Sequence, residues 1–145
     1  MIESKCGKYI VTQLKLPSSV PQGMPDPEKY RERILYLDNE VVEGAFYLSS
    51  GWYLKASGIQ QAEAHTHDFD EVVAFFGSDP ENPLDLCGEI EFWLDGEKHI
   101  INKSCLIFVP KGLSHCPYWI RRVDRPIAHF STAPYGTYVQ KTTEP

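Results

Sequence analysis

The sequence predicts an all-β fold of the sandwich or barrel kind, and three observations support this. Short segments rich in β-branched and aromatic residues, spaced about ten residues apart and separated by Gly and Pro turns, fill the chain from Glu40 onward. Asp95-Gly96 stands between two such segments and is a strong signal for a two-residue hairpin. Cys105 to Val109 is apolar without a break, which is typical of a strand buried on both faces.

The first part of the chain predicts an extension with less regular structure. Lys8 to Thr12 reads as a strand, and the prolines between Pro17 and Pro27 exclude a helix or a central strand there, so we expect a wrapping loop. Glu28 to Leu37 is compatible with two structures. Asp26 as N-cap and Pro27 at the first position favour a short helix, whereas Ile34-Leu35-Tyr36-Leu37 favours a strand.

The remaining segments are predicted strands and turns in chain order. The predicted strands are Glu40 to Leu48, Gly51 to Ala56, Ala64 to Phe76, Glu89 to Leu94, Glu97 to Ile101, Cys105 to Val109, Ser114 to Val123 and Ile127 to Thr132. A turn at Ser49-Ser50-Gly51 is expected to join the first two. Residues 78–86, acidic and containing Pro, are expected to form a loop.

A chain of 145 residues is the size of one ordinary domain. We expect residues 1–39 to form a strand and loop extension on the barrel, residues 40–132 to form the barrel, and residues 133–145 to form a tail. The net charge of −6 argues against nucleic acid or an anionic membrane surface as a partner. The N-terminus lacks the apolar core of a signal peptide, so a cytoplasmic protein is expected.

The four cysteines have no C-x-x-C spacing, so neither a zinc knuckle nor a redox pair is indicated. In a reducing compartment we expect them to be packed thiols. Cys116 directly follows His115, and alternation would turn it away from any group that His115 binds.

Candidate metal ligands lie in His65-Thr66-His67-Asp68-Phe69-Asp70-Glu71. In an unbroken strand, residues two apart share a face, so His65, His67 and Glu71 would project together. Imidazole nitrogens and a carboxylate oxygen suit a divalent first-row metal. His115, which follows the Pro110-Lys111-Gly112 turn, would supply a third imidazole and leave about two positions of a six-coordinate metal open.

These residues resemble the two metal-binding motifs of the cupin superfamily. His-x-His-x3-Glu followed by Pro-x-Gly-x2-His covers roughly Gly58 to Phe130, about half of the chain, and includes all four ligand positions. The resemblance implies a cupin-type double-stranded β-helix (jelly-roll) barrel with an N-terminal extension. It also implies that His65, His67, Glu71 and His115 bind one divalent transition metal, which would be Fe, Mn, Ni, Co or Zn.

The sequence departs from the family pattern outside the ligands. Ile59 stands where the first motif opens with Gly, while Ser104 and Trp119 replace the leading Gly and trailing Asn of the second. The glycine that closes the first motif is either Gly77, one position early, or Gly88, displaced by an insertion at residues 78–86. The second alignment is preferred, because Gly-Glu-Ile-Glu-Phe-Trp-Leu reads like the strand that follows the motif.

Residues around the metal are expected to line a substrate pocket. If His115 points inward, alternation places Pro117, Trp119 and Arg121 on its face, with Trp119 as an aromatic wall and Arg121 available to a substrate carboxylate. Tyr53 and Phe75 are further pocket candidates, although core packing explains them equally well. His129 is a candidate acid–base group, with a core histidine as the simpler interpretation.

Two classes of function follow from the resemblance. The first is a metal-dependent enzyme, of the dioxygenase, isomerase, decarboxylase or lyase type, that acts on a small oxygen-rich metabolite. The second is a non-catalytic binding or sensing cupin. Sensing cupins usually carry a DNA-binding segment, and residues 1–40 are too Pro-rich to form a helix-turn-helix, so this class is disfavoured. A metal-free cupin of the sugar-epimerase kind would not need this His and Glu set. By the same resemblance, a homodimer that pairs through N-terminal strands is expected.

Overall fold

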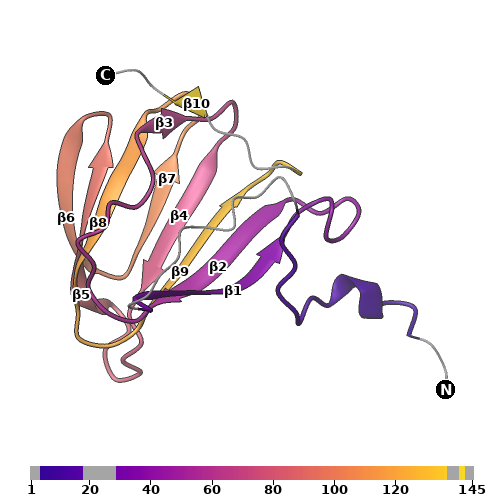
Figure 1. Cartoon of the computed structure of the whole chain (residues 1–145), viewed down its shortest axis with the longest axis horizontal. Coiled ribbons are helices and arrows are strands. Elements are labelled where there is room, and N and C mark those ends of the chain that lie inside the picture. Colours follow the sequence, from indigo (N-terminus) through magenta and orange to yellow (C-terminus); the bar gives the residue numbers. More distant parts are fainter. Residues whose placement is uncertain (1–3, 18–28, 137–140, 143–145) are drawn as a thin grey trace.

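Two antiparallel sheets face each other in the computed structural model, which describes residues 4–17, 29–136 and 141–142 (Figure 1). One sheet has the strand order β1-β2-β9-β4-β7 and the other β10-β3-β8-β5-β6. The strands are β1 (Arg31–Leu37), β2 (Tyr47–Tyr53), β3 (His65–Thr66), β4 (Glu71–Phe76), β5 (Asp85–Leu94), β6 (Glu97–Lys103), β7 (Cys105–Val109), β8 (His115–Val123), β9 (Ile127–Ala133) and β10 (Lys141–Thr142). The predicted all-β fold, with the sheets arranged as in a jelly-roll barrel, is confirmed.

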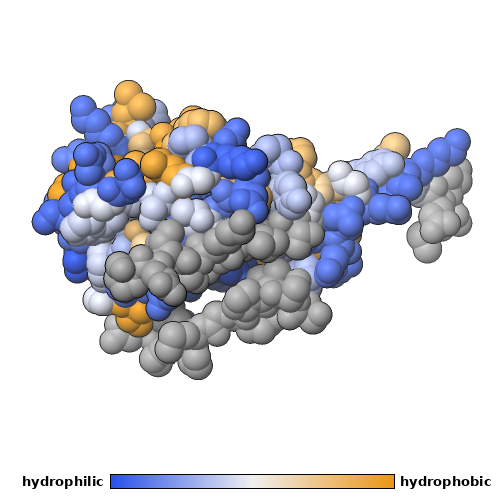
Figure 2. All heavy atoms as spheres, turned by 90° about the horizontal axis from the view of Figure 1, so that it is seen from above, coloured by the Kyte–Doolittle hydropathy of each residue, from blue (hydrophilic) through white to orange (hydrophobic). Residues whose placement is uncertain are grey.

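The N-terminal part differs from the prediction. The predicted strand at Lys8 to Thr12 is wrong: Gly7–Tyr9 forms a short 3-10 helix, η1, which projects away from the sheets (Figures 1 and 2). Tyr9 and Ile10 are exposed there, so no sheet covers the apolar side chains that suggested a strand. The predicted wrapping loop and the candidate caps Asp26 and Pro27 lie largely outside the described residues, as does the start of the alternative helix.

Of the two structures open to Glu28 to Leu37, the strand is correct. β1 is antiparallel to β2 and shows alternating burial up to a bulge between Arg33 and Leu35. β1 lies within the predicted N-terminal extension, yet it is an edge strand of the first sheet. The proposed division of the chain into extension, barrel and tail stays a prediction.

The predicted turn at Ser49-Ser50-Gly51 is wrong, because β2 runs through these residues without a break. A Cβ on Gly51 would lie 2.7 Å from the carbonyl oxygen of Glu32. The glycine therefore permits a close approach of β1 beside its bulge, where a turn was expected. Residues 40–44, predicted as the start of a strand, form turns instead.

The Asp95-Gly96 hairpin between β5 and β6 is confirmed, and both of its turn residues have positive φ angles, 47° and 77°. Residues 77–84 form the predicted loop between β4 and β5. Ala64 to Phe76, in contrast, is two strands and not one, because residues 67–70 leave the sheet between β3 and β4.

The prediction that Cys105 to Val109 is buried on both faces is wrong. β7 is an edge strand of the first sheet, and its Leu106 and Phe108 side chains are 66% and 61% exposed. Ile107 and Val109 point inward and join the main core between the sheets. An unbroken apolar run thus marks an edge strand with an apolar outer face.

The main core lies between the two sheets and includes the fully buried side chains Tyr53, Phe75, Ile90, Ile120 and Ile127. A smaller cluster of Tyr36, Tyr47, Phe69 and Ala133 lies at one end of β2 and β9. All four cysteines are free thiols, but only Cys116 is buried, and the expectation of a packed thiol is wrong for the exposed Cys6. In the described part of the chain, no helix has the length and apolar character needed to cross a membrane.

Candidate metal centre

Two segments far apart in the sequence are joined at the candidate centre. His65 in β3 and His115 in β8 are direct register partners. The His67 carbonyl accepts a hydrogen bond from the Gly112 amide at 3.0 Å, and the Asp70 carboxylate accepts one from the Lys111 amide at 2.8 Å. Gly112 has a φ of +84°, which glycine adopts without a steric penalty. The turn before His115 is therefore fixed against the loop that carries His67.

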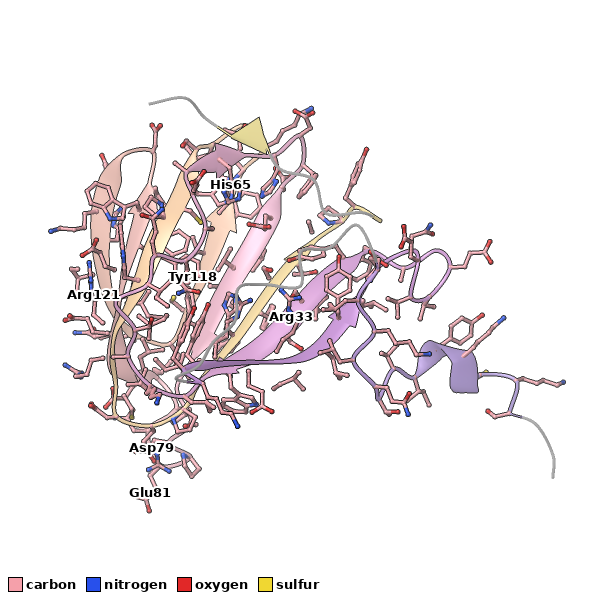
Figure 3. The ribbon with its side chains drawn as sticks, in the orientation of Figure 1. Arg33, His65, Asp79, Glu81, Tyr118 and Arg121 are labelled. Atoms are coloured by element: carbon pink, nitrogen blue, oxygen red, sulfur yellow. The ribbon has the colours of Figure 1, made fainter. Side chains whose placement is uncertain are left out.

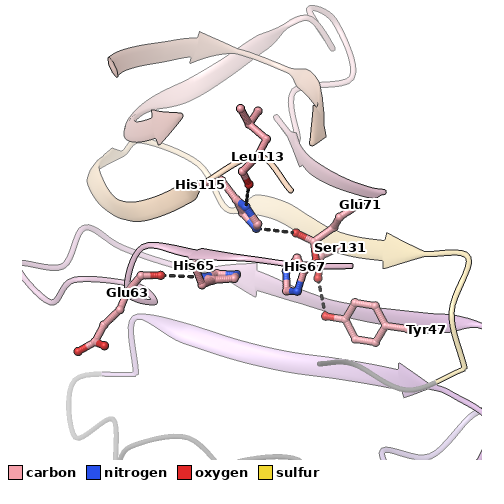
Figure 4. A network of polar contacts seen from close by, with 8 residues as sticks. All are labelled: Tyr47, Glu63, His65, His67, Glu71, Leu113, His115 and Ser131. Atoms are coloured by element: carbon pink, nitrogen blue, oxygen red, sulfur yellow. Dashed lines mark hydrogen bonds and ion pairs between the residues drawn. The ribbon is translucent and has the colours of Figure 1, made fainter. Parts of the chain in front are cut away.

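The four predicted ligands lie together at this junction, and all are buried (Figure 4). Ligand atoms of His65, His67 and His115 lie within 4.8 Å of one another. The Glu71 carboxylate approaches two of these rings, with Oε2 at 3.5 Å from His67 Nε2 and Oε1 at 3.3 Å from His115 Nε2. Three imidazoles and one carboxylate thus converge on one small volume.

Backbone carbonyls fix the tautomer of two of the rings. His65 Nδ1 lies 2.6 Å from the Glu63 carbonyl oxygen, and His115 Nδ1 lies 3.0 Å from that of Leu113. A carbonyl oxygen only accepts hydrogen bonds, so each Nδ1 must donate its N–H. In a neutral ring the lone pair then lies on Nε2. This outer hydrogen bond is the usual support of a metal-binding histidine.

Burial keeps the His65 ring neutral. The pKa of His65 is lowered to about 4 by burial first, and by the positive charges that His115 and His67 would carry, against the opposing hydrogen bond to Glu63. A neutral imidazole is the form that binds a metal. At neutral pH the His65 ring is therefore ready to ligate.

The donor set fits a divalent transition metal. His115 Nε2 is buried and makes no hydrogen bond to any described residue, so no hydrogen-bond donor satisfies its lone pair. A cation among the three imidazoles would satisfy it, and Glu71 would balance part of the charge. Nitrogen and oxygen donors of this kind accept Fe, Mn, Ni, Co or Zn.

The prediction that Trp119 and Arg121 line the pocket on the same face as His115 is wrong. The pairing of β8 with β5 shifts register between Phe92 and Leu94, so the alternation after His115 slips by one residue. Trp119 and Arg121 then lie on the outer face. There the Arg121 guanidinium stacks 4.9 Å from the Trp119 ring centroid and pairs with Glu91 at 3.1 Å, away from the interior (Figure 3).

The same slip turns Cys116 and Tyr118 inward. Cys116 is buried in the main core, contrary to the expected orientation, and burial and the Glu71 carboxylate raise the pKa of its thiol to about 12. A thiol with such a pKa is protonated and packs as an apolar group. Tyr118, which the alternation argument missed, donates or accepts a 2.6 Å hydrogen bond with the Tyr53 hydroxyl.

Tyr53, Phe75 and His129 lie together in the interior beside Tyr118. His129 stacks on Phe75 with ring centroids 4.7 Å apart and donates from Nδ1 to the Ala74 carbonyl at 3.0 Å. Burial first, and then the Arg31 charge, lower the pKa of His129 to about 3. The ring is neutral at physiological pH and carries its lone pair on Nε2.

Known structures with a similar fold were compared with this one. A polyketide cyclase, RemF from Streptomyces resistomycificus, superposes with a TM-score of 0.51 at 16% identity, over 81% of this chain and 73% of that one. A Klebsiella pneumoniae protein of uncharacterised function with a double-stranded β-helix domain gives 0.53 at 12% identity, over 83% and 90%. A recombinant oxalate oxidase in complex with glycolate gives 0.54 at 11% identity, over 93% and 63%.

No family model and no curated protein sequence matches the chain. The structural similarity therefore shows the fold, which is a double-stranded β-helix. A buried histidine triad with an adjacent glutamate occupies one end of that fold. The jelly-roll fold that the resemblance implied is confirmed.

Proposed function

We propose that the protein is a metal-dependent cupin enzyme that acts on a small oxygen-rich metabolite. The observation that carries this proposal is the convergence of three buried imidazoles and the Glu71 carboxylate on one volume. Four protein ligands would close a tetrahedral site, but they leave about two positions of a six-coordinate metal open. A dioxygenase, isomerase, decarboxylase or lyase reaction is compatible with this arrangement.

When bound, a divalent metal would polarise an oxygen ligand or acidify a coordinated water. The residues of the chain have distinct tasks around it. The Glu63 and Leu113 carbonyls hold the rings of His65 and His115 in one orientation. His129 offers a neutral nitrogen at Nε2, and its low pKa makes it a weak proton acceptor, so a role as hydrogen-bond acceptor fits it better than general base catalysis.

The second candidate function is a non-catalytic cupin that binds or senses a metal-chelating metabolite. The same four ligands support it, because an open metal position binds a ligand whether or not a reaction follows. Turnover separates the two functions. The sequence-based expectations of a homodimer and of a cytoplasmic location stay predictions.

The test uses the purified full chain loaded in turn with Fe, Mn, Ni, Co and Zn. Oxygen consumption with panels of diketones, catechols and enediols reports oxygenase activity, and product analysis under anaerobic conditions reports isomerase, lyase or decarboxylase activity. Metal-dependent turnover that is lost in Glu71→Ala supports the enzyme. Thermal stabilisation by a panel member without turnover under any metal supports the binding module.

A further inference from the structure

Two arginines of β1 face the interior of the barrel. Burial alternates along the first half of the strand, with Glu32 and Ile34 exposed and Arg31 and Arg33 partly buried. The Arg31 guanidinium lies 5.9 Å from the ring centroid of Tyr53, a side chain with no exposed surface. Figure 3 shows Arg33 on the inner side of its sheet, whereas Arg121 points outward from the opposite sheet.

Tyr47, near the candidate site, interacts electrostatically with both arginines. Burial raises the pKa of Tyr47 to about 12, with a further contribution from the Glu71 carboxylate. The hydrogen bond to Ser131 and the charges of Arg33 and Arg31 oppose this rise in pKa. Tyr47 is therefore within electrostatic range of both the Glu71 carboxylate and the two guanidiniums. Its hydroxyl contacts Ser131 Oγ at 2.7 Å (Figure 4).

Among the residues that the structure describes, no carboxylate balances the charge of Arg33. Within the described residues it forms no ion pair, although the chain has 20 acidic and 14 basic side chains. Burial and the neighbouring Arg31 lower the pKa of Arg33. A partly buried charge beside a like charge is unfavourable unless a counter-ion compensates it. The matched residue outside the barrel, Arg121, has Glu91 at 3.1 Å.

We infer that the substrate of the proposed site is an anion, and that Arg33, with Arg31, binds its oxyanion group while the opposite end reaches the metal. A guanidinium presents parallel N–H donors that match two oxygens of one carboxylate or phosphate group. The inference rests on the proposed function, since the metal defines the reactive end of the substrate. It moves the substrate-binding role that the sequence suggested for Arg121 to β1.

The experiment measures binding to the metal-loaded full chain by calorimetry, with metal content determined on each sample. The probes are glycolate and succinate as carboxylates, methyl phosphate, and the neutral compounds glycolamide and ethylene glycol. The variants are Arg33→Met, Arg33→Lys and the outer-face control Arg121→Met. Anions are expected to bind to the wild type, and Arg33→Met to weaken this binding roughly tenfold or more. Arg121→Met is expected to leave it unchanged.

Stability separates binding from a structural role. Arg33→Met is expected to unfold at the same or a higher temperature than the wild type without ligand, since it removes an unbalanced charge. A large loss of stability would assign Arg33 to the fold and overturn the inference. Preference for methyl phosphate identifies a phosphate ester, and preference for glycolate or succinate identifies a carboxylic acid; both support it.

Three further results would overturn the inference. These are equal anion affinity in Arg33→Met and wild type, neutral probes that bind as tightly as anions, and a fully metal-loaded wild type that binds no anion in the millimolar range. If the wild type binds no metal at all, the proposed function itself fails. The metal measurement therefore distinguishes the two failures.

Discussion

His65 in β3 lies directly opposite His115 in β8, with ring centroids 4.2 Å apart and 50 positions between them in the chain. The pairing of two strands, and not the alternation within one, brings the halves of the candidate centre together. Each ring is oriented by a carbonyl two residues before it, Glu63 for His65 and Leu113 for His115. The same local hydrogen bond thus orients both imidazole rings.

Asp70 is predicted to support the centre from outside it. Replacing Asp70 with Ala removes the acceptor of the Lys111 amide and loosens the turn that precedes His115. We expect unfolding to become about 1–2 kcal/mol easier and metal affinity to fall roughly tenfold. Denaturant unfolding and metal titration measure the two effects. Asp70→Asn keeps an acceptor and should lose less, and Asp124→Ala, an exposed carboxylate paired with Arg122, should change neither.

The hydrogen bond between the Tyr53 and Tyr118 hydroxyls predicts that substitutions of these two residues have non-additive effects on the free energy of unfolding. The two hydroxyls form a hydrogen bond of 2.6 Å with each other in the interior. Tyr118→Phe leaves the Tyr53 hydroxyl buried without this bond and should cost about 1–2 kcal/mol, as should Tyr53→Phe. The double variant should cost clearly less than the sum, because no orphaned hydroxyl remains. Denaturant unfolding of the four proteins that shows simple additivity would contradict this account.

His129 predicts how stability depends on pH. Its folded pKa of about 3 lies below the ordinary value of 6.5, so the unfolded chain binds more protons between these two values. The stability that the neutral ring contributes is complete above pH 6.5 and is lost as the pH falls toward 3, by an amount on the order of 5 kcal/mol.

Comparison with His129→Gln isolates this contribution, since that variant has no titrating ring at the position. Its unfolding free energy should fall less steeply than that of the wild type across the same window. Arg31, Tyr53 and Tyr118 are the charged or titratable groups that face the ring, and none of them changes charge between pH 3 and 6.5. Parallel curves for the two proteins would show that His129 does not carry the effect.

The resemblance predicts a homodimer that pairs through N-terminal strands. The exposed apolar side chains of the structure lead us to expect the outer face of the first sheet as the contact instead. Leu106 and Phe108 on the edge strand β7 are largely exposed, and Phe108 lines an apolar groove of about 350 Å³ with Phe46 and Val72. An apolar edge strand left uncovered promotes association. Light scattering should give twice the chain mass for the wild type and a lower mass for Phe108→Ser. A monomeric wild type would contradict the prediction.

The all-β class and the ligand set were predictable because they depend on local patterns. The Asp95-Gly96 turn chemistry and the spacing of His65, His67 and Glu71 are visible in short windows of sequence. The candidate ligands converge as predicted, but alternation along a single strand does not by itself explain their positions. Residues 67–70 form a loop, so hydrogen bonds from Lys111 and Gly112 position His67 and Glu71, in place of one continuous strand.

The wall of the pocket was not predictable from alternation. A bulge in β8 shifts the side chains that follow it, from Pro117 to Arg121, by one position. Pro117 is compatible with a bulge, but without knowledge of the opposing strand it does not show which neighbours turn inward. Tyr118 therefore points inward, and Trp119 and Arg121 lie on the outer face. Arg31 and Arg33, two residues apart in a segment with β-branched and aromatic neighbours, carried a usable signal, but the possible helix at Glu28 to Leu37 obscured their shared face.

Metal analysis of the purified chain tests the central claim most directly. After dialysis, mass spectrometry should find about one divalent transition metal ion per wild-type chain and little in His115→Ala or Glu71→Ala. His99→Ala, which removes an exposed histidine of the β5–β6 hairpin, should retain the wild-type content. Unchanged metal content in both His115→Ala and Glu71→Ala would contradict the assignment of these buried side chains as a metal centre.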